Sequence, residues 1–114
     1  MYSISHHEKV WGYEKWIVNN DLYCGKILFL IKDKRSSFHY HYTKHETFYL
    51  QSGKVLVKYC NSDNIDLCKS IILNSGDKFE IEPLLRHQIL ALEDSELFEF
   101  STTHSEEDRC RISI

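Results

Sequence analysis

The chain is poor in the residues that usually separate one folded unit from another. Its 114 residues include one proline and four glycines, and no stretch is rich in either. There is also no internal repeat and no low-complexity run. Apolar residues make up 42% of the chain, which is enough to fill one core but not two. We therefore expect residues 1–114 to form a single domain.

Long apolar runs are missing as well. The longest one, residues 27–31, is far shorter than the roughly 20 residues that a membrane-spanning helix needs. The N-terminal segment lacks the charged-then-apolar order of a signal peptide. These two absences predict a cytoplasmic protein that has no membrane partner.

Positive charge is neither abundant nor concentrated. The chain has 14 lysines and arginines against 17 acidic residues, which gives a formal net charge of -3. Apart from a short cluster at residues 32–35, the basic residues are scattered, whereas nucleic-acid-binding proteins gather them into a patch or stripe. We do not expect nucleic acid to be a partner.

None of the four cysteines forms a C-x-x-C pair. Without an export signal, the chain is expected to keep Cys24, Cys60, Cys68 and Cys110 as reduced thiols in the core. Cys60 and Cys68 flank a turn and could face each other across a hairpin, so a disulfide in oxidising conditions is the alternative. Neither interpretation makes a cysteine catalytic.

Helical periodicity is also missing, because no window of a dozen residues repeats its apolar positions every 3.6 residues. Short apolar runs bounded by Gly, Asn, Asp or Ser predict instead an all-β chain of about ten antiparallel strands. Such a chain suits a double-sheet jelly roll with a mouth for a ligand. The expected strands are residues 14–18, 25–31, 37–42, 46–51, 55–59, 65–73, 78–81, 87–92, 96–101 and 109–114.

The sequence does contain side chains of the types that bind metals, on neighbouring expected strands. His39 and His41 are two residues apart, and side chains two apart in a strand share a face. In the following strand, Glu46 has the parity of the apolar residues, whereas His45 has the parity of the polar ones. We therefore choose Glu46 rather than His45 as the inward-facing ligand.

A third histidine, His87, begins a later strand. Both faces of that strand carry apolar residues, so alternation does not predict which way the His87 side chain points. Three imidazoles and one carboxylate form a ligand set that a divalent transition metal accepts. We predict a site for Zn, Mn, Fe, Ni or Co made by His39, His41, Glu46 and His87.

These residues resemble the two sequence motifs of the cupin family. The first motif has the form HxH, three or four residues, Glu, six residues, Gly, and it is matched by His39, His41, Glu46 and Gly53. The second motif is matched in order by Gly76, Pro83 and His87, with residues 84–86 in place of the usual glycine. The resemblance implies a double-stranded β-helix, that is, a jelly-roll cupin barrel.

The two ends of the chain resemble the cupin domain at the C-terminus of type II phosphomannose isomerases. Residues 10–14 resemble a Pro-Trp-Gly element, with Val10 in place of the proline, and Asp108 and Arg111 fall on the acidic-then-arginine pattern of the closing segment. This resemblance implies an isomerase or epimerase acting on a sugar or sugar phosphate. The alternative is that Trp11 is a hydrophobic plug and the terminal charges form surface pairs.

An isomerase needs a base within reach of the proton that moves. The conceivable bases are Glu99, His104 and a barrel-lining tyrosine, Tyr49. A phosphate or carboxylate of the substrate would need a cationic receptor. The candidates are Arg86, Lys26 and Arg111, with Arg86 as the first choice because it adjoins His87.

Two further classes of function remain open. Cupin sites of this kind also serve mononuclear iron dioxygenases, because Fe(II) can take both substrate and O2, and a cupin can be a non-catalytic sugar-binding module. We expect a homodimer formed through an edge strand, to which residues 2–4 could add a strand. We expect His6 and His7, in the polar N-terminal segment, to be mobile and without a role.

Overall fold

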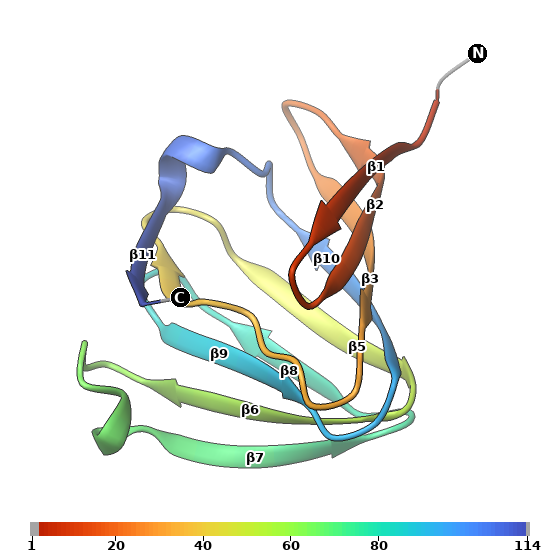
Figure 1. Cartoon of the computed structure of the whole chain (residues 1–114). Helices are drawn as coiled ribbons and strands as arrows, with labels where there is room; N and C mark the ends of the chain where they lie inside the picture. Colours follow the sequence, from red (N-terminus) through yellow and green to blue (C-terminus); the bar gives the residue numbers. More distant parts are fainter. Residues whose placement is uncertain (1–2, 114) are drawn as a thin grey trace.

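The computed structural model describes residues 3–113, which form eleven β-strands and two short 3-10 helices (Figure 1). Within this range no helix is long and apolar enough to cross a membrane. The elements are β1 (Ser5–Lys9), β2 (Gly12–Asn19), β3 (Cys24–Leu30), β4 (Phe38–His41), β5 (Glu46–Ser52), β6 (Lys54–Cys60), η1 (Ile65–Leu67), β7 (Lys69–Asn74), β8 (Lys78–Ile81), β9 (Arg86–Ala91), β10 (Ser95–Ser101), η2 (Glu106–Asp108) and β11 (Arg109–Ser113).

The strands form two antiparallel sheets that face each other across the interior (Figure 1). The six-stranded sheet has the order β1-β2-β3-β10-β5-β8, and the five-stranded sheet has the order β11-β4-β9-β6-β7. Strands distant in the chain are therefore neighbours, as β3 is with β10 and β4 with β9. The predicted all-β jelly roll is confirmed.

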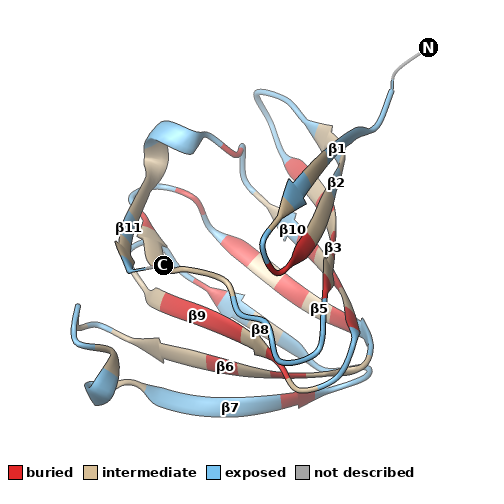
Figure 2. Ribbon diagram, in the orientation of Figure 1, coloured by how far each residue is buried: buried red, intermediate tan, exposed pale blue. Residues whose placement is uncertain are grey.

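The core lies between the sheets and follows from strand alternation. Along β3, β5 and β10, buried positions alternate with partly exposed ones, and Figure 2 shows this alternation along β5. The buried apolar cluster consists of Trp11, Leu28, Leu30, Phe48, Leu50, Val55, Val57, Leu73, Ile81, Ile89, Ala91 and Leu97.

The inward positions change from apolar to polar along several strands. In β5 the inward residues Phe48 and Leu50 are preceded by Glu46, and in β9 the inward residues Ile89 and Ala91 are preceded by His87. The same change occurs in β3 at Lys26 and in β10 at Glu99, which pair with each other in register. The interior is therefore divided into an apolar part and a buried polar part.

The turn predicted at Ser52–Gly53 joins β5 to β6 and requires glycine. Gly53 has a φ of +95°, in the region that side chains with a Cβ rarely adopt. A Cβ added there would collide with the Ser95 hydroxyl and lie 2.5 Å from the Asp94 carbonyl oxygen. The glycine of the first cupin motif thus permits close contact between two turns.

The predicted strand over residues 65–73 is wrong in its first part. Residues Ile65–Leu67 form η1, because the Asn64 side chain accepts a hydrogen bond from the Asp66 N–H at 3.0 Å and starts a helical turn. The strand β7 begins only at Lys69. The capping side chain of Asn64 therefore favours a helical turn where the apolar pattern predicts a strand.

The N-terminal segment is more ordered than the sequence predicts. Residues Ser5–Lys9 form β1, an edge strand on β2, and the His7 ring stacks on Trp16 with 4.1 Å between centroids. The expectation that His6 and His7 are mobile is therefore wrong. In the expected partner-binding strand over residues 2–4, residue 2 lies outside the described residues, and residues 3 and 4 belong to no strand.

Cys60 and Cys68 form a disulfide, so the expectation of four reduced thiols is wrong for this pair. The two residues lie at the loop end of the β6–β7 hairpin, next to the pair of Tyr59 with Lys69. The alternative prediction, a Cys60–Cys68 disulfide across the hairpin, is the one that matches the structure. Cys24 is a buried free thiol and Cys110 a partly buried one.

Candidate metal centre

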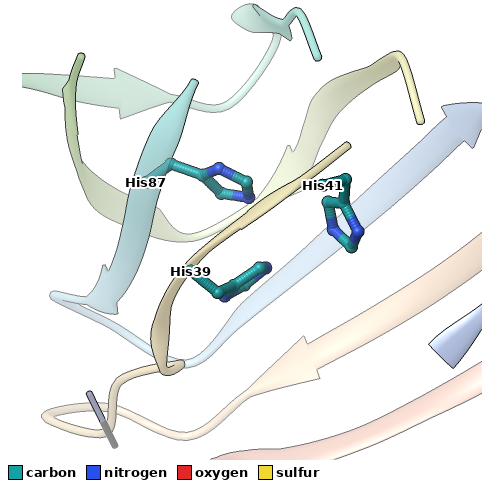
Figure 3. Close-up of side chains that lie close together, drawn as sticks. All are labelled: His39, His41 and His87. Atoms are coloured by element: carbon teal, nitrogen blue, oxygen red, sulfur yellow. The ribbon is translucent and has the colours of Figure 1, made fainter. Parts of the chain in front are cut away.

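Three imidazoles converge in the polar part of the interior (Figure 3). His39 and His41 project from β4 and His87 from β9, and His39 lies directly opposite His87 in the strand pairing. Their ligand nitrogens all lie within 4.8 Å of one another. Because these atoms are so close, the three residues could hold one metal ion.

Backbone carbonyls orient two of the rings. The Nδ1 of His39 lies 2.9 Å from the Ser37 carbonyl oxygen, and the Nδ1 of His87 lies 2.9 Å from the Leu85 carbonyl oxygen. A ring that donates its Nδ1–H in this way keeps the lone pair of Nε2 for a metal. Each contact thus prepares the imidazole as a ligand.

Glu46 approaches the histidines from β5. Its Oε1 lies 3.3 Å from His87 Nε2 and 4.0 Å from His41 Nε2, and its side chain is 2% exposed. His45 points outward instead and contacts Glu80 at 2.9 Å. The structure therefore brings the four predicted metal-site residues together and leaves His45 outside.

The polar atoms of this cluster fit a cation. Among the described residues, His87 Nε2 and His41 Nδ1 are buried without a hydrogen-bond partner. If His87 donates through Nδ1, its Nε2 lone pair faces the Glu46 oxygen, so that two buried acceptors meet with no proton between them. Such a contact is costly unless a cation lies between the two atoms. The donor set therefore fits a divalent transition metal.

Burial and neighbouring charges together keep His39, His41 and Glu46 in their metal-binding protonation states. It lowers the pKa of His39 well below its usual value, and it lowers the pKa of His41 to about 4 despite the nearby Glu46. Burial raises the pKa of Glu46, but the charge of Lys44 opposes this rise, and the pKa is held well below its usual value. The two imidazoles are thus neutral and Glu46 is ionised near neutral pH, as metal ligation requires.

An internal ion cluster adjoins Glu46. The Lys44 Nζ lies 3.2 Å from Glu46 Oε2, contacts Glu99 Oε2, and lies 2.9 Å from His104 Nδ1. Burial raises the pKa of Glu99 and the nearby Glu46 raises it further, while Lys44 opposes the rise. The cluster connects the histidines to two of the predicted candidate bases, Glu99 and His104.

The centre opens into a cavity of about 340 Å³. Binding pockets for small organic molecules have volumes from about 300 Å³ upward. Apolar side chains form part of its wall, namely Trp11, Leu28, Phe48 and Ile89. The wall also includes charged and titratable side chains, among them Lys26, Arg35, Lys44, Glu46, Glu99, His104, Arg109 and Arg111.

Strand β11 places two arginines opposite the histidines of β4. Arg109 pairs with His41 and Arg111 with His39, and residues directly opposite each other project from the same face of a sheet. Arg109 contacts Glu106 at 2.8 Å, whereas Arg111 forms no ion pair with any residue from 3 to 113. The guanidinium group of Arg111 thus remains available to an anion, as does that of Arg35, which lines the same cavity and forms no ion pair among residues 3–113.

Lys26 lines the same cavity but is already paired. Its Nζ lies 3.5 Å from Glu14 and 4.4 Å from the ring centroid of Trp16, and its side chain is 2% exposed. A ligand that bound Lys26 would have to share it with Glu14. Of the two predicted anion receptors in the cavity, Arg111 is therefore the less committed.

Two predicted site residues lie away from the cavity. Arg86 precedes His87 in β9 and projects from the other face, where it contacts Asp63 at 2.8 Å. Tyr49 faces outward from β5 and packs near Phe98. Side chains of adjacent residues in a strand point to opposite faces of the sheet. Because His87 points toward the centre, Arg86 points away from it.

Sequence reasoning did not select Lys44, although a signal was present. Lys44 precedes Glu46 by two residues, in the spacer between HxH and Glu, and is 2% exposed. A lysine near the inward-facing glutamate could have suggested a buried ion pair. Asp108, noted only for its place in the terminal pattern, accepts hydrogen bonds from Thr43 N–H and Lys44 N–H.

Comparisons with known proteins support the fold. No family model matches the chain, and no curated protein matches it by sequence. Among solved structures, the capsular polysaccharide assembling protein CapF from Staphylococcus aureus is similar over 100% of this chain and 35% of its own, with 16% identity and a TM-score of 0.83. KdgF from Halomonas sp. is similar over 93% of this chain and 90% of its own, with 15% identity and a TM-score of 0.76.

Oxalate decarboxylase from Bacillus subtilis is similar over 95% of this chain and 30% of its own, with 18% identity and a TM-score of 0.80. The chain thus spans about a third of CapF and of oxalate decarboxylase, and most of KdgF. All three are cupin-fold proteins, so the chain has the cupin jelly-roll fold. Identities this low show the fold alone, because one fold hosts many functions.

Proposed function

We propose that the chain is a metal-dependent cupin that acts on a sugar or sugar phosphate as an isomerase or epimerase. Its divalent transition metal would be held by His39, His41, His87 and Glu46. The observation that carries this proposal is the convergence of three imidazoles and one carboxylate around the unpartnered Nε2 of His87.

The type of metal follows from the donor atoms. Three imidazole nitrogens with one carboxylate oxygen suit Mn, Fe, Co, Ni or Zn better than Mg or Ca, which prefer oxygen ligands. The work on oxalate decarboxylase from Bacillus subtilis concerns Mn(II) centres, in a protein of the same fold. Mn is therefore included among the metals to be tested first.

The shape and charge of the cavity support a small anionic substrate. Its volume of about 340 Å³ suits a single sugar unit, and Arg111 supplies a guanidinium group without an ion-pair partner among the described residues. Guanidinium groups bind phosphates and carboxylates through paired hydrogen bonds. The resemblance of the chain ends to type II phosphomannose isomerases points to the same substrate class.

A bound divalent metal would supply Lewis-acid chemistry by polarising a carbonyl oxygen of the substrate. The proton transfer is then assigned to Glu99, which lines the cavity from β10. Its Oε2 is held by Lys44 and by the Ser101 hydroxyl, and no hydrogen bond to Oε1 is found among residues 3–113. The raised pKa of Glu99 brings this carboxyl closer to the working pH, as a general base requires.

His104 is the weaker candidate for the base. Its Nδ1 lies 2.9 Å from Lys44 Nζ and its Nε2 lies 3.0 Å from Glu106 Oε1. Both ring nitrogens are therefore engaged within the protein. A proton acceptor needs a free lone pair, which favours Glu99.

The test is metal analysis followed by a substrate screen. The purified protein is stripped, reloaded separately with Mn, Zn, Ni, Co or Fe, and assayed with ketose and aldose phosphates. Ketose–aldose conversion that depends on the metal supports the proposal. Consumption of O2 by the Fe-loaded protein would support the dioxygenase alternative, and an intact fold that binds no metal would support a non-catalytic module.

A further inference from the structure

Lys44 is fully committed to contacts within the protein. An ammonium group has three N–H donors, and Lys44 has three partners, namely Glu46 Oε2, Glu99 Oε2 and His104 Nδ1. Its side chain is 2% exposed, so water does not compete for these donors. Lys44 therefore has no donor left for a substrate, although it lies in the cavity wall.

The backbone that carries Lys44 is also held in place. The Asp108 carboxylate accepts hydrogen bonds from the Thr43 and Lys44 N–H groups, at 2.9 and 3.0 Å. The same carboxylate accepts from the Thr43 hydroxyl at 2.9 Å. The position of the lysine is thus fixed at both its backbone and its ammonium group.

The two carboxylate oxygens of Glu46 face different partners. Oε1 faces His87 at 3.3 Å, while Oε2 faces the Lys44 ammonium at 3.2 Å. A carboxylate can bind a metal through one oxygen or through both. Here the second oxygen is occupied by a charged hydrogen-bond donor.

We propose that Lys44 is a positioning residue that makes Glu46 a one-oxygen ligand and so leaves a coordination position free for the small molecule. This inference rests on the proposed metal site. Without the lysine, Oε2 would be free to turn toward the metal and compete with an incoming ligand. Partners that orient a ligand in this way often change metal-site properties as strongly as the ligands themselves.

The experiment removes Lys44 together with its counter-charge. Lys44→Met alone would leave Glu46 and Glu99 as buried carboxylates without their cation, which destabilises a fold. The double variant Lys44→Met/Glu99→Gln removes one positive and one negative charge. Its folding is checked by thermal melting before Co(II) is added.

Two readouts follow from the Co(II)-loaded proteins. The double variant should have weaker visible absorption bands than the wild type, because a second carboxylate oxygen raises the coordination number. Acetohydroxamate, a probe that chelates through two oxygens, should bind the double variant about tenfold or more weakly. Neither readout depends on enzymatic turnover.

Two control variants distinguish the loss of the Lys44–Glu46 contact from a general change of charge. Glu99→Gln alone keeps Lys44 against Glu46, so its spectrum and acetohydroxamate affinity should be those of the wild type. Lys78→Met removes an exposed lysine from β8 and should also leave both unchanged. A Glu99→Gln spectrum like that of the double variant would overturn the role of Lys44.

X-ray absorption of the Co(II)-loaded wild type supplies a measurement that needs no variant. Binding through both oxygens of Glu46 in that protein would overturn the inference, as would a double variant with wild-type spectrum and chelator affinity. If Co(II) binds the histidines but one of these results contradicts the role of Lys44, only that role is overturned and the proposed metal site stands. If the wild type binds no Co(II) at the histidines, both proposals are overturned.

Discussion

Arg111 lies directly opposite His39 in the pairing of β11 with β4. The two side chains therefore project from the same face of the sheet, and both line the cavity. This places a guanidinium group beside a proposed metal ligand. A substrate that chelates the metal could present its phosphate or carboxylate to Arg111.

Replacing Arg111 with alanine should weaken the binding of a phosphate-bearing ligand without affecting the metal. Loss of a charged hydrogen bond corresponds to about a 10- to 100-fold rise in Kd or KM. Arg86→Ala is the matched control, because Arg86 faces away from the cavity and should give wild-type values. Equal losses in the two variants, measured by titration calorimetry or steady-state kinetics, would contradict the assignment.

Replacing His87 with alanine should lower the affinity for Co(II) or Zn(II) by about 100-fold or more, because one of four ligands is removed. His45→Ala is the control, since His45 is exposed and contacts Glu80 instead of the centre. Competition with a chromophoric chelator measures both affinities. Unchanged affinity in His87→Ala would place the metal elsewhere.

The sequence was sufficient for the fold and for the convergence of the histidines. The all-β fold, the shared face of His39 and His41, and the inward face of Glu46 follow from alternation within single strands. His87 was predicted from its place in the second cupin motif, because alternation did not test it. The expectation that His6 and His7 are mobile failed for a different reason. Residues Ser5–Lys9 contain few strong β-formers and become a strand only because β2 supplies a partner.

Contacts between distant segments could not be predicted. Two partners of Lys44, Glu99 in β10 and His104 in the loop that follows, lie 55 and 60 residues away in the chain. The register that places Arg111 opposite His39 is likewise a property of the closed sheet. Arg86 was favoured because it adjoins His87, although the alternation of strand side chains argues against this choice.

Replacing Glu99 with glutamine should abolish most turnover while leaving metal affinity within about twofold. Loss of a general base lowers kcat by about 100- to 10,000-fold. Glu96→Gln is the control on the same strand, because Glu96 lies at an outward-facing position of β10. A Glu99→Gln enzyme with wild-type kcat, measured with the substrate found in the screen, would exclude Glu99 as the base.

The metal-free protein should lose stability as the pH falls from about 6.5 toward 4. The pKa of His41 is lowered from 6.5 to about 4 in the folded state, and that of His39 is also lowered, so the unfolded chain binds more protons in this range. The stability is fully present above pH 6.5, and His41 alone accounts for a loss of about 3 kcal/mol by pH 4. Glu46, whose pKa lies well below 4.5, adds its own loss only at lower pH.

Urea unfolding at pH 7.5, 5.5 and 4.5 measures this dependence. The variant His39→Asn/His41→Asn should show a flatter profile, because the groups responsible are missing. Identical pH profiles for this variant and the wild type would show that the two histidines are not buried in their neutral form.

Replacing Gly53 with alanine should destabilise the fold more than replacing Gly76. Both glycines have positive φ, +95° and +93°, which costs a residue with a Cβ about 1–2 kcal/mol. A Cβ at Gly53 would also collide with Ser95, whereas a Cβ at Gly76 would meet nothing within 4 Å. Denaturant unfolding should show a larger loss for Gly53→Ala, and equal losses would mean that the two turns are not in close contact.

Crystals grown with Co(II) and measured on both sides of its absorption edge test the central claim most directly. The anomalous difference map should show one strong peak bound by His39, His41, His87 and one oxygen of Glu46, with the second oxygen still against Lys44. A peak at another place, or no peak among these four side chains, would contradict the account.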